Sequence, residues 1–216
     1  MRVVAVPVKS LSRAKTRLSP ALTGLERGAL TLAMLEDVLD AALSVPGWET
    51  WVISPDEVAL EIAAGRGARP IPEAKPPLAN AIRQVEAKAK EEGANALAVL
   101  PADVPLVTVD TLHEALRTLG AVVLARSADG SGTSLLLRRP PRAIPARFGP
   151  DSFRKHAESA RARGLPVSVV DSPGLAFDLD LPEHLPRVLA KAGRGRTAGA
   201  LRELDAMARL AALAGR

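Results

Sequence analysis

The sequence predicts an α/β protein of three layers, in which helices cover both faces of a mostly parallel sheet. One observation is the alternation along the chain of short β-branched apolar runs with longer segments of helical apolar spacing. The other is composition: 47% of the 216 residues are hydrophobic but only 2% are aromatic. The core must then consist of Leu, Val, Ala and Ile, which is typical of a sheet covered by helices.

The elements follow one another in a regular order. The apolar run at 2–8 predicts a buried strand, and the spacing at 25–43 predicts a helix. Further strands are expected at 50–54, 96–100, 121–125, 133–139 and 166–171. Further helices are expected at 57–65, 78–93, 108–118, 150–164 and 182–193. Alternating strands and helices are joined by crossover connections, which give a mostly parallel sheet. Ligands of such sheets bind beyond the carboxyl ends of the strands, so functional residues are expected directly after strands.

The predicted domain organisation is one main domain over 1–193 and a helical appendage over 194–216. The segment "AGRGRTAG" at 192–199 predicts a flexible joint. The amphipathic pattern that follows predicts a helix that packs either on the body or on a second subunit, which leaves a homodimer open.

Composition excludes several classes of protein. The chain has no cysteine, which rules out disulfides, zinc-thiolate sites and a cysteine nucleophile. The N-terminal apolar run is too short for a signal peptide, and no stretch reaches the roughly 20 apolar residues that a membrane span needs. We therefore expect a cytoplasmic, soluble protein with no membrane partner. The net charge of +5 is modest, but basic residues gather near both ends and could meet an anionic ligand.

The segment "VPVKSLSRAKTRLSP" at 6–20 follows the first strand and contains Lys9, Lys15 and Arg17. It matches neither the P-loop nor the dinucleotide fingerprint. A lysine supplies a point charge and an arginine a planar fork for phosphate oxygens, so this loop suits a triphosphate. The alternative is a solvated basic loop.

Asp103, in "VLPADVPL", comes three residues after a predicted buried strand. The next helix is expected to begin near Thr108, so helix capping explains this aspartate poorly. We predict that Asp103 is a ligand for a hard cation.

Two further aspartates stand in the apolar segment "GLAFDLDLPEHL". If 175–181 is extended, Asp178 and Asp180 lie on one face and the apolar residues on the other. Carboxylates about 7 Å apart along a strand repel each other unless a cation lies near them, and Mg²⁺ suits such oxygens. The alternative is that Asp180 caps the helix that begins near Pro182, while the other acid is merely exposed.

Two glycine-containing segments offer backbone to a ligand. Gly130 and Gly132, in "ADGSGTSLLL", allow close approach of a ligand, although a tight turn is the better explanation of this segment taken alone. Gly149 precedes a helix whose first turn includes Ser152, and free N–H groups there suit phosphate. His156 could be a general base, but a surface or packing role is the simpler interpretation.

These segments together resemble the 2-phospho-L-lactate/phosphoenolpyruvate guanylyltransferases of deazaflavin coenzyme F(420) biosynthesis. The matching segments occur in family order over roughly 3–187 and include "VPVKSLSRAKTRLSP", "VISPD", "LANAI", "VLPADVPL", "DGSGTSLLL", "RFGPDSFRKHAESA" and "GLAFDLDLPEHL". Two positions depart from the usual family pattern. Ser134 stands where many members have asparagine, and an extra alanine precedes Asn80.

The resemblance implies a fold like that of the nucleotide-diphospho-sugar transferases, and it implies roles for individual residues. It implies that Mg²⁺ is held by Asp103, Asp178 and Asp180. It places Lys9 near the substrate phosphate and Lys15 and Arg17 beside the triphosphate, and with Asp103 these form the catalytic set. The nucleotide-binding set implied is Lys15, Arg17, Ser54, Asn80 and Pro101, and the acid-binding set is Thr133, Gly149 and Ser152.

The reaction implied by the resemblance joins GMP from GTP to the phosphate of phosphoenolpyruvate or 2-phospho-L-lactate and releases pyrophosphate. The attacking phosphate is already ionised, so no general base is required, which agrees with the lack of a convincing catalytic histidine. One alternative is transfer to another acceptor, such as 3-phosphoglycerate, a sugar phosphate or a pterin. A remote alternative, a nucleic-acid-binding module, leaves the three aspartates unexplained, so we expect no nucleic-acid partner.

Overall fold

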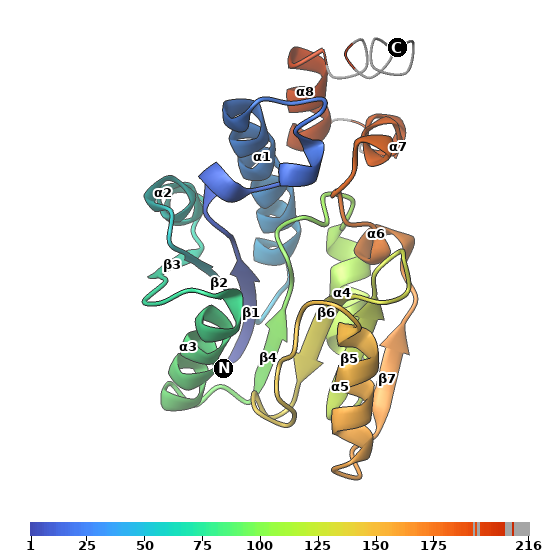
Figure 1. Cartoon of the computed structure of the whole chain (residues 1–216). Helices are drawn as coiled ribbons and strands as arrows, with labels where there is room; N and C mark the ends of the chain where they lie inside the picture. The colour runs from blue at the N-terminus through green and yellow to red at the C-terminus, as the bar shows by residue number, and fades with distance from the viewer. Residues whose placement is uncertain (192, 194, 206–208, 210–216) are drawn as a thin grey trace.

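A seven-stranded sheet forms the centre of the protein, with helices on both faces (Figure 1). The computed structural model describes residues 1–191, 193, 195–205 and 209. The strand order is β3-β2-β1-β4-β6-β5-β7. The strands are β1 (Arg2–Pro7), β2 (Glu49–Ser54), β3 (Arg69–Pro72), β4 (Ala96–Val99), β5 (Val122–Arg126), β6 (Thr133–Arg138) and β7 (Val167–Val170). All neighbouring pairs are parallel except those of β6, which runs antiparallel to β4 and β5. The predicted mostly parallel α/β fold is confirmed.

The helices fall close to the predicted ranges. They are α1 (Gly24–Leu43), α2 (Glu57–Gly65), α3 (Leu78–Glu91), α4 (Val109–Arg117), α5 (Ser152–Arg161), α6 (Pro173–Ala176), α7 (Leu185–Lys191) and α8 (Arg196–Glu203), with 3-10 turns η1 (Leu11–Arg13), η2 (Thr16–Leu18) and η3 (Pro182–His184). The long helix α1 begins at a capping box, in which Thr23 Oγ1 accepts from the Glu26 N–H and the Glu26 carboxylate accepts from the Thr23 N–H. Among the helices that the structure describes, none has both the length and the apolar character needed to cross a bilayer.

Strand β1 is buried on both faces, which explains its continuous apolar sequence. Val4 and Val6 point to one face and pack in a cluster with residues of α1 and α4. Val3 and Ala5 point to the opposite face and pack in a second cluster with residues of α3. This alternation along a single strand produces the three layers.

Two segments differ from expectation. Strand β3 was not predicted, because its sequence "RPIP" contains two prolines. It lies at the edge of the sheet, where a proline that lacks an N–H is tolerated. The segment expected to be extended over 175–181 instead begins in α6, which Ser172 caps. From Phe177 the chain pairs with no strand in the described sheet, although Leu179 N–H donates to the Asp103 carbonyl at 2.9 Å.

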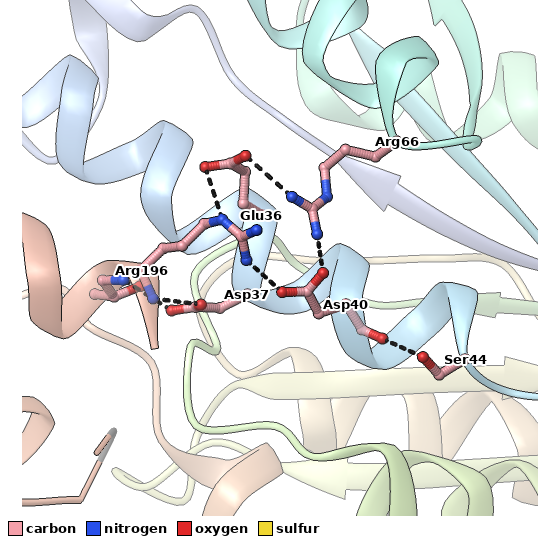
Figure 2. Close-up of polar contacts among 7 residues, drawn as sticks. Glu36, Asp37, Asp40, Ser44, Arg66 and Arg196 are labelled. Atoms are coloured by element: carbon pink, nitrogen blue, oxygen red, sulfur yellow. Dashed lines mark hydrogen bonds and ion pairs between the residues drawn. The ribbon is translucent and has the colours of Figure 1, made fainter. Parts of the chain in front are cut away.

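The C-terminal helix α8 packs on the body of the protein. It begins at Arg196, so the prediction of a flexible joint over 192–199 is wrong for the second half of that segment. Leu201 is buried in a cluster that includes Leu18, Met34 and Phe177. Asp37 on α1 accepts from the first N–H groups of α8, and Arg196 of α8 forms ion pairs with Glu36 and Asp40, which also contact Arg66 of the α2 C-terminus (Figure 2). The predicted domain boundary remains a prediction, because 192 and 194 lie outside the described residues. So do 206–208 and 210–216 of the predicted terminal helix.

Candidate active site

A cavity of about 650 Å³ opens at the edge of the sheet where the parallel strands β1, β4 and β5 end. Because β6 is antiparallel, its first residue, Thr133, lies at this same edge. The cavity is lined by most of the residues that the sequence singled out: Lys9, Lys15, Arg17, Pro101, Asp103, Thr133, Gly149, Ser152, Asp178 and Asp180. Residues from five separate parts of the chain are thereby brought to one place.

Ser54 and Asn80 are not among the residues that line the cavity. Ser54 is buried at the end of β2, where its hydroxyl accepts from the Asp56 N–H at 3.0 Å. The Asn80 amide donates to the Pro76 carbonyl at 2.8 Å and accepts from Arg83 at 3.1 Å. Both side chains therefore make local contacts, and their part in nucleotide binding remains a prediction.

The basic loop after β1 folds back onto the aspartates. Lys15 Nζ lies 2.7 Å from Asp103 Oδ2 and 3.6 Å from Asp180 Oδ1, and Arg17 Nη1 lies 2.8 Å from Asp180 Oδ2. The Lys15 side chain is only 8% exposed, whereas that of Arg17 is 69% exposed. Lys15 also has a left-handed backbone, with φ +50°, which directs the loop into the following turn η2. The loop thus places one shielded and one exposed cation against the carboxylates.

The two explanations of these aspartates by helix capping fail. Asp180 binds Arg17 and Lys15 through its carboxylate, and the residue at the N-cap position of η3 is Leu181. Thr108 caps α4, because its hydroxyl accepts from the Thr111 N–H at 3.2 Å. Asp103 therefore does not cap this helix. Both carboxylates instead face the cavity.

The surroundings of Asp178 disfavour its negative charge. Burial raises the pKa of this carboxyl, and the negative charges of Asp103 and Asp180 add to the effect, while Lys15 partly opposes it. Phe177 and Leu179, on either side of it, are fully buried, so the expected alternation holds although no strand forms. Asp178 is therefore held near other carboxylates at an energetic cost, which a bound cation would relieve.

The donor set fits Mg²⁺ in its chemistry. The three side chains are all carboxylates that line one cavity, and hard oxygen ligands are what this ion prefers. Among the described residues, no three carboxylate or imidazole groups already lie in a ligating arrangement. The Lys15 ammonium now supplies the positive charge between Asp103 and Asp180.

The turn between β5 and β6 forms another part of the wall and contains an aspartate that sequence reasoning did not select. The Asp129 carboxylate accepts hydrogen bonds from the hydroxyls of Ser127 and Ser131 and from the Ser131 N–H, which hold its pKa well below the usual range. A Cβ on Gly132 would lie 2.5 Å from Ser127 Oγ, so a larger residue there would displace the hydroxyl that binds Asp129. The signal was available in "ADGSG", because aspartate often accepts from backbone two residues on in such turns.

The start of α5 forms the remaining wall. Gly149 has φ +118°, and Ser152, the first residue of the helix, is 1% exposed. Asp151 occupies the N-cap position but its side chain makes no capping hydrogen bond. His156, one turn further on, is fully buried, which confirms the packing interpretation over the surface one. Burial, and then the charges of Arg138 and Arg147, lower the pKa of His156 to about 4.

Several enzymes of related sequence act on small phosphorylated acids. The phosphoenolpyruvate guanylyltransferase of Rubrobacter xylanophilus is 41% identical over 87% of this chain and 93% of its own length. The 3-phospho-D-glycerate guanylyltransferase of Phenylobacterium zucineum is 38% identical over 88% and 91%. The 2-phospho-L-lactate guanylyltransferase of Methanothermobacter thermautotrophicus is 37% identical over 85% and 82%.

The fold is shared more widely. A crystal structure from Desulfovibrio desulfuricans, provisionally assigned as a nucleotide-diphospho-sugar transferase, superposes with a TM-score of 0.80 at 19% identity, over 97% of this chain and 98% of the other. That likeness confirms the expected nucleotide-diphospho-sugar transferase-like fold. The family model described as "Guanylyl transferase CofC like" matches residues 1–209. With sequence, fold and cavity in agreement, this chain belongs to the family of CofC-like guanylyl transferases.

Proposed function

We propose that the protein transfers GMP from GTP to the phosphate of phosphoenolpyruvate and releases pyrophosphate. The observation that supports it is a single cavity lined both by cations with three aspartates and by the Thr133, Gly149 and Ser152 group. A triphosphate suits the first set, and a small acid that carries a phosphate suits the second. The product belongs to coenzyme F(420) biosynthesis, the pathway that the family resemblance implies.

The proposed reaction is an in-line displacement at the α-phosphorus of GTP. An oxygen of the acceptor phosphate forms the new P–O bond, the bond to the β-phosphate oxygen breaks, and pyrophosphate leaves with that electron pair. The acceptor phosphate is ionised at neutral pH, so the step needs no general base. Catalysis then depends on holding the two anionic substrates in line and on neutralising their charge.

The cations of the loop after β1 supply that neutralisation in the proposal. Lys9 lines the cavity and binds the acceptor phosphate, while Lys15 and Arg17 turn from the aspartates to the triphosphate. Asp103, Asp178 and Asp180 would hold Mg²⁺, which when bound would neutralise phosphate charge and polarise the α-phosphoryl group. Removing any of these aspartates should therefore weaken catalysis much more than it weakens the fold.

A second acceptor, 3-phosphoglycerate, has a specific observation in its favour. The relative named for that acid is nearly as similar to this chain as the one named for phosphoenolpyruvate, at 38% against 41% identity. These acids share a carboxylate and a phosphate and differ in only a few atoms. Phosphoenolpyruvate remains the first choice, because its relative has the higher identity of the two.

The experiment is a pyrophosphate-release assay with purified protein, GTP, Mg²⁺ and each candidate acid in turn. Phosphoenolpyruvate should give the highest kcat/KM, and ATP or CTP in place of GTP should give little turnover. Asp178→Asn and Asp180→Asn should largely abolish turnover. The control Asp171→Asn, which changes an exposed aspartate just before α6 and outside the cavity wall, should not. Near-normal turnover in both site variants, with circular dichroism unchanged, would contradict the proposal.

A further inference from the structure

The buried side chain of His156 connects three elements that meet at the acceptor side of the cavity. Its Nδ1 lies 3.0 Å from the hydroxyl oxygen of Thr133, the first residue of β6. Its Nε2 lies 2.8 Å from the backbone nitrogen of Arg147, two residues before Gly149. The ring is also in edge contact with Phe148, at a centroid distance of 5.3 Å, and its own helix α5 carries Ser152.

The hydrogen bonds determine which ring nitrogen carries the proton. A backbone N–H can only donate, so Nε2 of His156 must accept from Arg147 and must itself be unprotonated. In a neutral imidazole the proton is then on Nδ1, and Nδ1–H donates to Thr133 Oγ1. A doubly protonated ring would place two donors against each other at Nε2.

This tautomer fixes the direction of the Thr133 hydroxyl. Its oxygen accepts from His156, so its own proton must point elsewhere, and Thr133 lines the cavity. No other hydrogen bond of this hydroxyl is found among the described residues. The Thr133 hydroxyl is thus left with a proton to donate at the cavity wall, and an anionic oxygen bound in the cavity can accept it.

We propose that His156 is a positioning residue that, as the Nδ1–H tautomer, holds the Thr133 hydroxyl as a donor to an anionic oxygen of the acceptor acid. The proposal rests on the proposed function for the identity of the acceptor. His156 touches no substrate in this scheme and acts only through Thr133. If His156 only stabilised the fold, replacing it would weaken the binding of GTP and the binding of the acid to the same extent.

A double-mutant cycle separates the two roles. Thr133→Val removes the hydroxyl at nearly constant shape. His156→Gln can keep an acceptor for Arg147 while it loses the donor at the δ position. Each single variant should lower kcat/KM for the acid by about 10- to 100-fold, the value of a hydrogen bond to a charged group. The KM for GTP should stay within about twofold of the wild type.

The cycle is decided by the double variant. If His156 acts through Thr133, His156→Gln should cost less than about threefold once Thr133 is already valine, because the hydroxyl that it orients is gone. Losses that simply multiply would overturn the proposal, and so would an equal rise in KM for GTP and acid. Thermal unfolding of each variant shows whether the fold is retained.

A second measurement on the unaltered protein covers the case in which His156→Gln does not fold. ¹⁵N NMR of the imidazole should show His156 with a protonated Nδ1 and an unprotonated Nε2 at neutral pH, and the Nδ1 signal should move when the acid is added without GTP. A protonated Nε2 would overturn the proposal, and so would an Nδ1 chemical shift that does not change at saturating acid. If the wild type turns over none of the acids, the proposed function fails. The tautomer of His156 is still measured independently by the ¹⁵N signals of its two ring nitrogens.

Discussion

Replacing Glu86 with glutamine should destabilise the protein by about 3–5 kcal/mol, the cost of leaving one partner of a buried ion pair alone. Glu86 lies on α3 and is 7% exposed, and its carboxylate pairs with Arg138 at the end of β6, which is 0% exposed. Arg138 Nη1 also donates to the Ile144 carbonyl at 3.1 Å, but its Nε and Nη2 have no partner among the described residues. Without the carboxylate, the guanidinium charge is buried with little compensation.

The assay is thermal and urea unfolding of the purified variant. For a chain of this length, each kcal/mol shifts Tm by about 2–4 °C, so Tm should fall by about 6–20 °C. The matched control is Glu158→Gln, which breaks an exposed pair with Arg154 and should cost less than about 1 kcal/mol. The double variant Glu86→Leu with Arg138→Met should recover most of the loss, because an apolar pair needs no compensation. A Glu86→Gln protein within 1 kcal/mol of wild type would refute this reasoning.

Three further predictions follow from the site. Because burial and Asp103 raise the pKa of Asp178, stability falls as the pH rises through that pKa. Asp178→Asn should thus be more stable than wild type to urea at pH 8, with the gain shrinking at low pH. Because the pKa of His156 is lowered to about 4, its contribution to stability is lost as the pH falls from about 6.5 through 4, and His156→Gln should flatten that part of the urea-unfolding profile. Gly149→Ala forces φ +118° on alanine, so it should lower the free energy of unfolding by about 1–3 kcal/mol and raise KM for the acid. The control is Gly65→Ala, which lies in a helix with open space around it and should stabilise the protein slightly.

Most of the candidate site could be selected from the sequence because its residues follow strands. Parallel strands bring their carboxyl ends to one edge, so Lys9, two residues after β1, and Asp103, four residues after β4, were expected at one site, and both line the cavity. Asp178 and Asp180 were found because two acids in an apolar run need an explanation. Ser54 also stands at a strand end, as the last residue of β2, but it does not line the cavity, and its role in nucleotide binding stays a prediction.

The rest of the site depends on contacts between distant parts of the chain. No spacing rule indicates that Lys15 reaches Asp103, 88 residues away, or that His156 reaches Thr133, 23 residues away. Asp129 is a different case, because its partners belong to its own turn and the local pattern "ADGSG" already carried the signal.

Local periodicity and residue type act over a few neighbouring positions, and they were enough to predict the α/β class, the order of most elements and most residues that line the cavity. The direction of β6, which brings Thr133 to the edge where parallel strands end, depends on pairing with distant strands and was visible only in the folded protein. Burial in the folded protein also lowers the pKa of His156 and raises that of Asp178, and the hydrogen bond from the Arg147 N–H selects the ring nitrogen of His156 that accepts. Burial and long-range pairing are properties of the whole packed molecule, so spacing along the chain does not encode them.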